Sequence, residues 1–487
     1  MLRDRRLTLH EDNSFMDIQY DFGMIGLGVM GSNLLLNMAD HGFAAIGYDL
    51  KPERAKAFED AAEKGTVVKG VANLEEMMVA LKKPRKIMML VPAGPPVDAV
   101  INSLLPFLEK GDIIIDGGNS YFKDTLKRVN YLQEKGLHFF GMGVSGGELG
   151  ARLGPSMMPG GDKEAYQYLK PILEAIAAKA EEQPCVAYMG HGAAGHYVKM
   201  VHNGIEYAMM QMISEAYDLL RRGAGFTNEE LHQTFLSWNK GQLQSFLINI
   251  TASVFKTKDE NSDEFLVDLI LDQAGSKGTG KWTSQEAMDL PVPIPTIDMA
   301  VAMRNLSVYK NDRTQAAQLY QQKTTPITMP REQLVSELEN ALAFSFVIAY
   351  AQGLSMLAKA SEELKMEIPL PAVIQVWKAG CIIRSSLLGN FTKAFQKNPT
   401  LSSLLLDNEI AKLLKNREGS LRKIISSAVL SKISLPGIMS VLAYYDYFSN
   451  ERMPTNLIQA QRDYFGAHTY QRIDKPGVFH TEWHEQI

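Results

Sequence analysis

The segment GHYVKMVHNGIEY (195–207) places four polar side chains at the spacing of a single helical face. Positions i, i+3, i+4 and i+7 of a helix point the same way, and here they are Lys199, His202, Asn203 and Glu206. A desolvated lysine can be neutral enough to accept a proton near neutral pH, and a partly buried glutamate can hold one. Imidazole and amide groups between them can bind hydroxyl groups. The segment therefore predicts a helix suited to acid–base chemistry in two stages.

A solvated helix face with a Lys–Glu pair is the alternative for this segment. The adjacent pair Asn203-Gly204 counts against it, because both residue types lower helix stability in mid-helix. Their presence indicates that something else approaches the helix closely at this point.

A glycine-rich segment near the N-terminus has the spacing of a dinucleotide-binding loop. Residues 21–36 read DFGMIGLGVMGSNLLL, with a strand expected before the G-x-G-x-x-G pattern and a helix after it. The first glycine permits the tight turn, the second lets a pyrophosphate approach the backbone, and the third packs helix against strand. A purely structural turn is the alternative, and an acidic residue about twenty positions later argues against it. The expected contacts are Gly26, Gly28, Val29, Met30 and Gly31.

That acidic residue, Asp49, bears on which dinucleotide binds. A carboxylate at the end of the second strand accepts hydrogen bonds from the adenosine ribose of NAD, and it repels the 2′-phosphate of NADP. Lys51 and Arg54 are able to soften that repulsion, although a solvated first helical turn is the favoured interpretation for both. The sequence therefore predicts an NAD(P) site that favours NAD over NADP.

Further candidate ligand residues follow the expected strands. Val91, Ala93 and Asn119 come after two of these strands, at the sheet edge where dinucleotides bind, and are expected to contact the cofactor. The Ser-Gly-Gly turn at 145–147 offers a hydroxyl group and unhindered amides. Such a turn is a suitable cradle for a carboxylate, with a flexible glycine turn as the alternative.

Candidate phosphate ligands are spread along the second half of the chain. A glycine-rich segment carries Lys277 and Thr279 without the spacing of a nucleotide-binding P-loop, yet it suits a phosphate grip. Arg304, Arg462 and His468 are further candidates. Taken alone, each of these residues is more often a surface residue than a ligand.

The elements that must position these residues divide the chain into four parts. From 21 to 192, five apolar runs alternate with helical patterns, which predicts βαβ units and a parallel sheet. From 193 to 450, long helical patterns predict a large all-helical domain. Residues 1–20 are expected to form a polar leader, and 451–487, which lack helical periodicity, an extended tail. The fold class is thus an α/β Rossmann-type domain, a large all-α domain and an extended C-terminal tail. The five runs are DFGMIGL, AAIGYDL, KIMMLVP, DIIIDGG and HFFGMGV.

Composition narrows the class of protein. The 487 residues are 46% hydrophobic and 22% charged, with a formal net charge of −5, which is typical of a globular enzyme and argues against a nucleic-acid partner. Two distant cysteines, Cys185 and Cys381, indicate neither a disulfide framework nor a zinc site and fit a reducing compartment. The apolar stretch 341–351 is too short to span a bilayer and indicates a buried core helix. The leader lacks the apolar segment of a signal peptide, so we expect a cytoplasmic protein without a membrane partner.

These segments together resemble the 6-phosphogluconate dehydrogenases, the decarboxylating enzymes of the pentose phosphate pathway. The resemblance runs in the family's order and spacing from about residue 22 to about residue 483. It implies that 6-phosphogluconate binds between the two domains, and that the tail of each subunit in a homodimer reaches into the site of its partner. The matching stretches are GLGVMGSNL, IIDGGNS, VSGGELGARLGPSMMPGG, KMVHNGIEY, WNKGQLQSFLI, KGTGKWT and QRDYFGAHTY.

The resemblance also implies roles for the matching residues. Lys199 would accept the proton of the C3 hydroxyl group and then stabilise the enolate as an ammonium, so no metal is needed. Glu206 would protonate C1 of the product, ribulose 5-phosphate. The carboxylate ligands would be Ser145, Gly146 and Gly147; the hydroxyl ligands Asn119, His202 and Asn203; and the phosphate ligands Tyr207, Lys277, Thr279, Arg304 and, from the partner subunit, Arg462 with His468 nearby.

The sequence departs from the family at four places. The family commonly has Ala at the position of Gly28, Asn-Arg-Ser/Thr at 49–51 and Lys at the position of Pro92. These three departures adjoin the cofactor and strengthen the expectation of NAD over NADP. The fourth, Ala208-Met209 in place of Gly-Asp, leaves the substrate chemistry unchanged.

Two other functions remain open from the sequence. A simple β-hydroxyacid dehydrogenase performs the redox step without loss of CO2, but that group lacks the KGTGKWT and RDYFGAH motifs. A non-catalytic dinucleotide-sensing protein is expected to have lost Lys199 or Glu206, and both are present.

Overall fold

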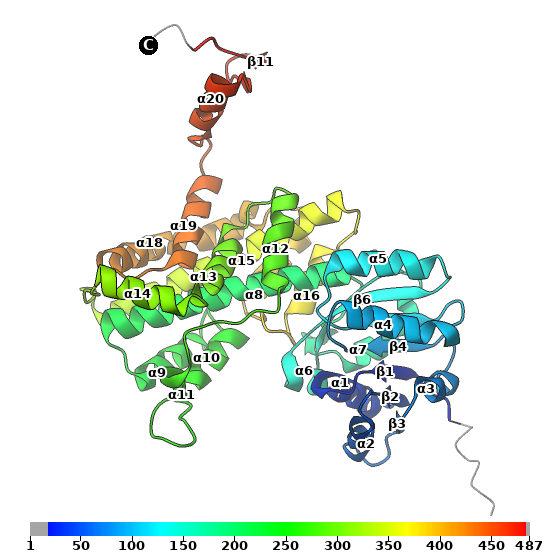
Figure 1. Cartoon of the computed structure of the whole chain (residues 1–487). Coiled ribbons are helices and arrows are strands. Elements are labelled where there is room, and N and C mark those ends of the chain that lie inside the picture. Colours follow the sequence, from blue (N-terminus) through cyan, green and yellow to red (C-terminus); the bar gives the residue numbers. More distant parts are fainter. Residues whose placement is uncertain (1–17, 484–487) are drawn as a thin grey trace, which may run out of the picture.

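The apolar runs of the first 190 residues pair into one seven-stranded sheet in the order β3-β2-β1-β4-β5-β6-β7. In this computed structural model, which describes residues 18–483, β1 to β6 are parallel and β7 runs antiparallel to β6 (Figure 1). The predicted Rossmann-type fold is confirmed. The strands are β1 (Phe22–Ile25), β2 (Ala45–Tyr48), β3 (Val68–Val71), β4 (Lys86–Met89), β5 (Ile113–Asp116), β6 (His138–Ser145) and β7 (Ser156–Gly160).

Helices cover both faces of this sheet. Side chains of α1, α2 and α7 pack with Met24 and Met88 on one face, whereas side chains of α3, α4 and α5 pack with Ile25 and Met89 on the other. Each central strand is therefore buried on two sides, which explains its continuous apolar run. The helices are α1 (Val29–Asp40), α2 (Pro52–Asp60), α3 (Leu74–Ala80), α4 (Pro95–Leu104), α5 (Phe122–Gln133), α6 (Gly147–Leu153) and α7 (Tyr166–Ile176).

Two strands of this sheet were absent from the sequence-based prediction, as was a separate short pair, β8 (Lys179–Ala180) and β9 (Gln183–Pro184). β3 is an edge strand of sequence VKGV, with three of its four residues only partly buried. β7 lies in a glycine-rich segment and contains Pro159, which an edge strand tolerates. Neither segment has the long apolar run of the central strands, so both depend on their neighbours in the sheet.

The predicted leader 1–20 is too long at its C-terminal end. Tyr20 is buried, its amide donates to the carbonyl group of Ala80 at 2.9 Å, and its carbonyl group accepts from the amide of Lys82 at 2.9 Å. The Rossmann-type domain therefore includes Tyr20. The rest of the leader lies outside the described residues except for residues 18 and 19.

The helical domain is built around α8 and α15. The apolar stretch predicted to form a core helix lies in α15, the one described helix that is long and apolar enough to cross a membrane; 89% of its most apolar window is buried inside the protein. The helices are α8 (Ala194–Asp218), α9 (Asn228–Trp238), α10 (Phe246–Lys256), α11 (Leu266–Leu269), α12 (Thr279–Asp289), α13 (Pro295–Ser307), α14 (Lys310–Tyr320), α15 (Arg331–Glu363), α16 (Leu370–Trp377), α17 (Leu388–Lys397), α18 (Asn408–Leu430) and α19 (Pro436–Phe448).

The glycine in the middle of α8 has a packing role. A Cβ atom at Gly204 would lie 2.8 Å from Thr283 of α12 and 3.2 Å from Ile297 of α13. The close approach expected at Asn203-Gly204 is therefore made, next to Gly204, by two neighbouring helices. It brings α12 and α13 against the polar face of α8.

The tail after residue 450 is not simply extended, which corrects the prediction. It contains α20 (Thr455–Gly466) and a short antiparallel pair, β10 (Tyr470–Gln471) and β11 (Val478–Phe479), and it projects from the helical domain (Figure 1). Leu457, Ile458 and Phe465 of α20 are exposed. These apolar side chains are not buried by the described chain, so α20 does not pack into the core of either domain.

Candidate functional site

The four polar residues of α8 form one buried cluster where α8 passes the end of β6. Nζ of Lys199 lies 3.4 Å from Nδ1 of His202, which is 3.0 Å from Oδ1 of Asn203 and 3.8 Å from Oε2 of Glu206. His202 is fully buried, whereas the Glu206 side chain is 21% exposed. The predicted helix face is thus buried and not solvated, and Glu206 has partial access to the open side of the cluster.

Burial shifts the pKa values of three residues in this cluster, and two of the shifts suit acid–base chemistry. Burial lowers the pKa of Lys199, and the nearby carboxylate of Glu206 only partly opposes this shift. Burial raises the pKa of Glu206, against the attraction of Lys199 and Arg304. Burial and the neighbouring Lys199 lower the pKa of His202 well below its ordinary value. The arrangement favours a neutral lysine as base and a protonated glutamate as acid, the pairing that proton transfer in both directions requires.

The Ser-Gly-Gly turn at the end of β6 lies against this cluster. Oγ of Ser145 is 3.4 Å from Nε2 of His202 and accepts a hydrogen bond from the amide of Ile382 at 3.4 Å. Gly146 and Gly147 have φ values of 122° and 65°, which favour glycine, and a Cβ atom at Gly146 would lie 2.6 Å from the carbonyl oxygen of Gly380. The turn can therefore present its backbone amides to an anionic group.

Cationic and hydroxyl-bearing side chains from other helices lie next to Asn203 and Tyr207 of α8. The Arg304 guanidinium lies 3.6 Å from the centre of the Tyr207 ring. Nδ2 of Asn203 donates to Oγ1 of Thr279 at 3.2 Å. Thr279 is the first residue of α12, and the exposed Lys277 precedes it by two positions. Four of the predicted phosphate ligands thus come from α8, α13 and the start of α12.

Arg462 and His468 do not join this group within one chain. Both are exposed on the projecting tail (Figure 1). The described chain therefore supplies all but two of the predicted substrate ligands from its own domains.

A pocket of about 380 Å³ lies at the carboxyl ends of β1, β2 and β4. Gly28 has open space where a Cβ atom would stand, whereas a Cβ atom at Gly31 would lie 1.9 Å from the carbonyl oxygen of Gly26. These are the roles expected for the second and third glycines of a dinucleotide loop. Of the predicted cofactor residues, those lining the pocket are Gly26, Gly28, Asp49 and Val91, and those outside it are Val29, Met30, Gly31, Ala93 and Asn119. Val29 and Met30 open α1, and the free amides of a helix N-terminus are suited to binding an anionic group such as a pyrophosphate.

Asp49 is buried at the rim of this pocket, and both of its oxygens already accept hydrogen bonds. The amides of Leu27 and Lys51 donate to it at 2.8 and 2.9 Å, and Nη1 of Arg54 lies 3.3 Å from Oδ2. Arg54 is therefore not simply solvated, as the sequence suggested, but paired with Asp49. Leu50, beside it, is exposed and lines the same pocket.

Asn119 is exposed on the loop between β5 and α5, and a buried network holds that loop. Oγ of Ser120 donates to Asp116 at 2.6 Å, and the amide of Gly118 donates to the same carboxylate at 3.0 Å. His196 of α8 lies 3.0 Å from the carbonyl oxygen of Asp116 through Nε2 and 2.7 Å from Oγ1 of Thr125 through Nδ1. The network ties the start of α8 to the cofactor edge of the sheet. Asp116, Gly118 and Ser120 lie in the stretch IIDGGNS, whereas Thr125 and His196 come from other segments, so the contacts between them are not visible in the sequence.

The residues that contact Lys199 and Ser145 from other segments of the chain were not predicted from the sequence. A Cβ atom at Gly143 would lie 2.4 Å from Cβ of Lys199, and Ile382 holds Ser145. Gly380 has a φ of 67°, a left-handed conformation that favours glycine, so its residue type was the one sequence signal for this turn.

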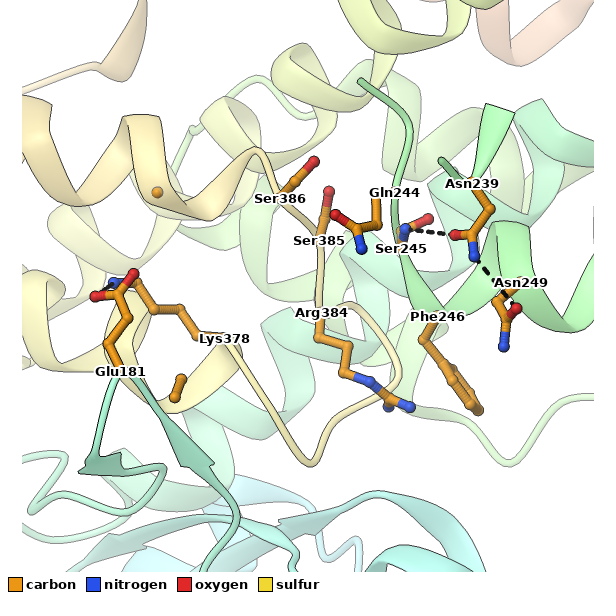
Figure 2. A pocket seen from close by; sticks show the side chains of 12 residues that line it. Glu181, Asn239, Gln244, Ser245, Phe246, Asn249, Lys378, Arg384, Ser385 and Ser386 are labelled. Atoms are coloured by element: carbon orange, nitrogen blue, oxygen red, sulfur yellow. Dashed lines mark hydrogen bonds and ion pairs between the residues drawn. The ribbon is translucent and has the colours of Figure 1, made fainter. Parts of the chain in front are cut away.

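A second, polar cleft of about 480 Å³ lies on the loop that follows α16 and contains none of the predicted site residues. Figure 2 shows Lys378 paired with Glu181, at 3.1 Å, and Arg384 beside the Phe246 ring, at 4.0 Å from its centre. This cleft therefore belongs to the region between β8–β9 and α10, not to the acid–base cluster.

The fold and the site together define a dinucleotide-dependent oxidoreductase with an internal acid–base pair. The family model for the NAD binding domain of 6-phosphogluconate dehydrogenase matches residues 21–190, and that for the 6-phosphogluconate dehydrogenase C-terminal domain matches 195–483. The chain belongs to the 6-phosphogluconate dehydrogenase family. This membership supports the predicted decarboxylating dehydrogenase over both alternatives.

Individual relatives agree along nearly the whole chain. The chain is 48% identical over 471 residues to the decarboxylating 6-phosphogluconate dehydrogenase of Lactococcus lactis IL1403, covering 96% of this chain and 99% of that protein. It is 49% identical over 462 residues to the NADP(+)-dependent, decarboxylating enzyme of Bacillus subtilis, covering 95% and 98%. The structure of 6-phosphogluconate dehydrogenase from Plasmodium falciparum, solved in its apo form and with NADP+ or 6-phosphogluconate, matches with a TM-score of 0.92 and 44% identity, covering 95% and 100%.

Proposed function

We propose that this protein oxidises and decarboxylates 6-phosphogluconate to ribulose 5-phosphate and CO2, with reduction of NAD(P)+. The observation that carries the proposal is the buried pair on α8, in which burial lowers the pKa of Lys199 and raises that of Glu206. A base and an acid on one helix face serve the two proton transfers of this reaction. The site of a simple dehydrogenase needs only the first.

In the first stage, neutral Lys199 removes the proton of the C3 hydroxyl group while C3 loses a hydride. When bound in the pocket at the glycine loop, the nicotinamide supplies the acceptor for that hydride. His202 and Asn203 hold hydroxyl groups of the substrate beside Lys199, and Asn119 does so from the loop after β5. The resulting 3-keto acid stays within reach of the lysine, which is now an ammonium.

In the second stage, the bond between C1 and C2 of the 3-keto acid breaks, and its electron pair moves toward the C3 carbonyl group as CO2 leaves. The Lys199 ammonium stabilises the developing enolate and returns a proton to its oxygen. Glu206 then protonates the carbon that lost CO2, which becomes C1 of ribulose 5-phosphate, while Lys199 takes back the proton of the enol oxygen and the ketone forms. Ser145, Gly146 and Gly147 bind the departing carboxylate before cleavage.

The substrate phosphate is proposed to bind between α8, α12 and α13. A phosphate monoester carries roughly −1.5 to −2 charges at neutral pH, so cationic groups are needed even in an acidic chain. Arg304 is held over the Tyr207 ring, and Thr279 opens α12, whose N-terminus favours an anion. Lys277 completes the group from the same chain.

We further propose a homodimer in which the tail of each subunit adds Arg462 and His468 to the partner's phosphate site. The exposed apolar side chains of α20 support this arrangement: Leu457 is 62% exposed, Ile458 56% and Phe465 72%. Such a surface is expected where a second chain covers it.

We propose that NAD is preferred over NADP, although the Bacillus subtilis relative is named NADP(+)-dependent and the Plasmodium falciparum structure was solved with NADP+. The buried carboxylate of Asp49 and the apolar side chain of Leu50 line the pocket beside the expected ribose. Arg54, the cation of that pocket lining, is paired with Asp49. Because Arg54 is engaged by Asp49, a 2′-phosphate would meet a carboxylate without gaining a separate cationic partner from this lining.

A cytoplasmic location is also proposed, supported by two cysteines that are free and buried.

The ratio of CO2 released to NAD(P)H formed tests the proposed function. Substrate labelled with ¹³C at C1 allows both products to be followed in one reaction. A ratio of one, with ribulose 5-phosphate as the remaining product, is expected. Formation of NAD(P)H without labelled CO2 would instead indicate a simple dehydrogenase. The absence of both NAD(P)H and labelled CO2 would indicate a non-catalytic sensing protein.

A further inference from the structure

The C-terminal tail folds around a single carboxylate. Asp463 of α20 is fully buried among the described residues. Its Oδ1 accepts hydrogen bonds from the amide of Thr469 and from Nδ1 of His480, both at 2.9 Å. Its Oδ2 accepts from the amide of Thr481 at 3.0 Å and from Nε1 of Trp483 at 2.8 Å. Four donors from residues 469–483 therefore converge on Asp463.

These donors keep the carboxylate charged. Burial alone would raise the pKa of Asp463, but the hydrogen bonds from His480, Trp483 and the amides of Thr481 and Thr469 lower it to about 2. The same contact raises the pKa of His480. Hydrogen bonds to an ionised acceptor are stronger than those between neutral groups. The charged carboxylate therefore holds residues 469–483 more strongly than a neutral side chain at this position would.

Asp463 also holds the sharp turn that carries His468. Ala467 and Thr469 have φ values of 49° and 60°, a left-handed conformation that costs energy for residues with a Cβ atom. The amide of Ala467 donates to the carbonyl oxygen of Asp463 at 2.9 Å, and that of Thr469 to its carboxylate. The strained residues on both sides of His468 are thus bonded to one residue of α20.

A chain of side-chain contacts extends from this turn to Arg462. Nε2 of Gln459 donates to the carbonyl oxygen of Thr469 at 2.6 Å, and Nη1 of Arg462 donates to Oε1 of Gln459 at 3.1 Å. The guanidinium of Arg462 is therefore oriented by the turn that Asp463 holds. Arg462 and His468 nevertheless remain exposed and free to meet another surface.

We propose that Asp463 is a positioning residue for the reaction: it folds the tail in advance so that Arg462 and His468 reach the partner's substrate phosphate as a fixed pair. The inference rests on the tail exchange of the proposed function and adds the group that makes the exchange productive. A segment held in its binding conformation loses less conformational entropy on binding. Loss of the Asp463 charge therefore weakens phosphate binding without removing any phosphate ligand.

A double-mutant cycle between Asp463→Asn and Arg462→Ala tests this inference in the full-length protein. Asparagine keeps the size of the side chain but not its charge. Because the tail binds substrate and transition state alike, Asp463→Asn is expected to raise the KM for 6-phosphogluconate about tenfold with kcat changed less than about threefold. In the Arg462→Ala background the same substitution is expected to add less than about twofold, since residues that act through one another are not additive.

Two controls separate positioning from general damage. Asp474→Asn removes an exposed tail carboxylate paired with Arg472 and is expected to leave KM unchanged. Trp483→Phe removes one of the four donors to Asp463 and is expected to raise KM by less than Asp463→Asn does. Analytical ultracentrifugation shows whether the Asp463→Asn variant keeps the oligomeric state of the wild-type protein. An unchanged KM in Asp463→Asn, or full additivity with Arg462→Ala, would overturn the proposal.

A readout independent of activity distinguishes failure of this inference from failure of the proposed function. The His480 ring is titrated by NMR in wild type and in Asp463→Asn, with a lower pKa expected in the variant. An equal pKa would show that Asp463 does not organise the tail. If Arg462→Ala instead leaves KM normal while the His480 pKa falls as expected, the phosphate role of Arg462 is wrong and the positioning role falls with it, although Asp463 still folds the tail.

Discussion

Gly143 of β6 lies directly against Lys199 of α8, and a Cβ atom at Gly143 would come within 2.4 Å of the lysine Cβ. The two domains therefore meet at Cβ of Lys199, the first atom of the proposed catalytic side chain. No side chain but hydrogen fits between the strand and the helix at this point. The position of the proposed base is therefore set by a glycine of the other domain.

Gly143→Ala is expected to displace Lys199 and lower kcat by about 10- to 100-fold, because overpacking of about 1–3 kcal/mol is relieved by movement of α8, and small misplacements of a reacting group are costly. Gly419→Ala is the matched control, since Gly419 of α18 has open space for a Cβ atom. Steady-state kinetics on both variants measure the effect. Equal kcat values for the two would show that this contact does not position the lysine.

The buried lysine should also reduce the stability of the protein in a pH-dependent way. Burial lowers the pKa of Lys199 from its ordinary 10.5, so the unfolded chain binds this proton more tightly than the folded protein does. The resulting cost is present at pH values below the folded pKa, decreases between that pKa and 10.5, and is absent above 10.5.

Lys199→Met is therefore expected to raise the Tm at pH 7, by roughly 1–2 °C for each kcal/mol relieved, and to lose that advantage as the pH approaches 10.5. Thermal unfolding from pH 7 to 10 measures this difference. Lys163→Met, at an exposed position, serves as control. A Tm difference that stays constant across this range would contradict a buried lysine with a lowered pKa.

Glu206→Gln is expected to lower kcat on the order of 10²-fold or more, because the amide cannot protonate the product carbon. Glu215→Gln is a control on the same helix: Glu215 is also buried, with its pKa raised to about 7 by burial, but it binds the amides of Gly437 and Ile438. That variant should keep a kcat near the wild-type value. A Glu206→Gln enzyme of normal turnover would remove Glu206 from the mechanism.

The cofactor preference is tested by the ratio of kcat/KM for NAD to that for NADP. The buried Asp49 predicts a higher value for NAD, and Leu50→Arg, which adds a cation at the pocket rim, should shift the ratio toward NADP by about tenfold, equivalent to about 1.4 kcal/mol. Val79→Arg, at an exposed position outside the pocket lining, is the control. A clear NADP preference in the wild-type protein would show that Asp49 does not set the choice.

The parts predicted well from sequence are those whose information is local. The glycine loop and the polar face of α8 are defined by spacing within one strand–turn–helix or one helix, and the structure forms both. The edge strands β3 and β7 and the helix α20 were missed because each depends on a neighbour: the adjoining strand, or the donors that gather on Asp463. Spacing along the chain carries no record of such contacts.

The same distinction holds within the site. Lys199 and Glu206 were found through their helical spacing, whereas Gly143 and Ile382, which hold Lys199 and Ser145, are tertiary neighbours from distant segments. Arg54 is exposed, as expected for the first turn of α2, but its ion pair with Asp49 was not predicted because that contact depends on the turn between β2 and α2.

Lys199 is proposed as the base of an oxidative decarboxylation, and the turnover of Lys199→Met with 6-phosphogluconate measures its contribution. Cofactor affinity, measured separately by fluorescence titration, should stay near the wild-type value because Lys199 lies outside the lining of the dinucleotide pocket. We expect kcat to fall on the order of 10³-fold or more, since the variant loses both the base and the ammonium that stabilises the enolate. A kcat within about tenfold of wild type would contradict the assignment.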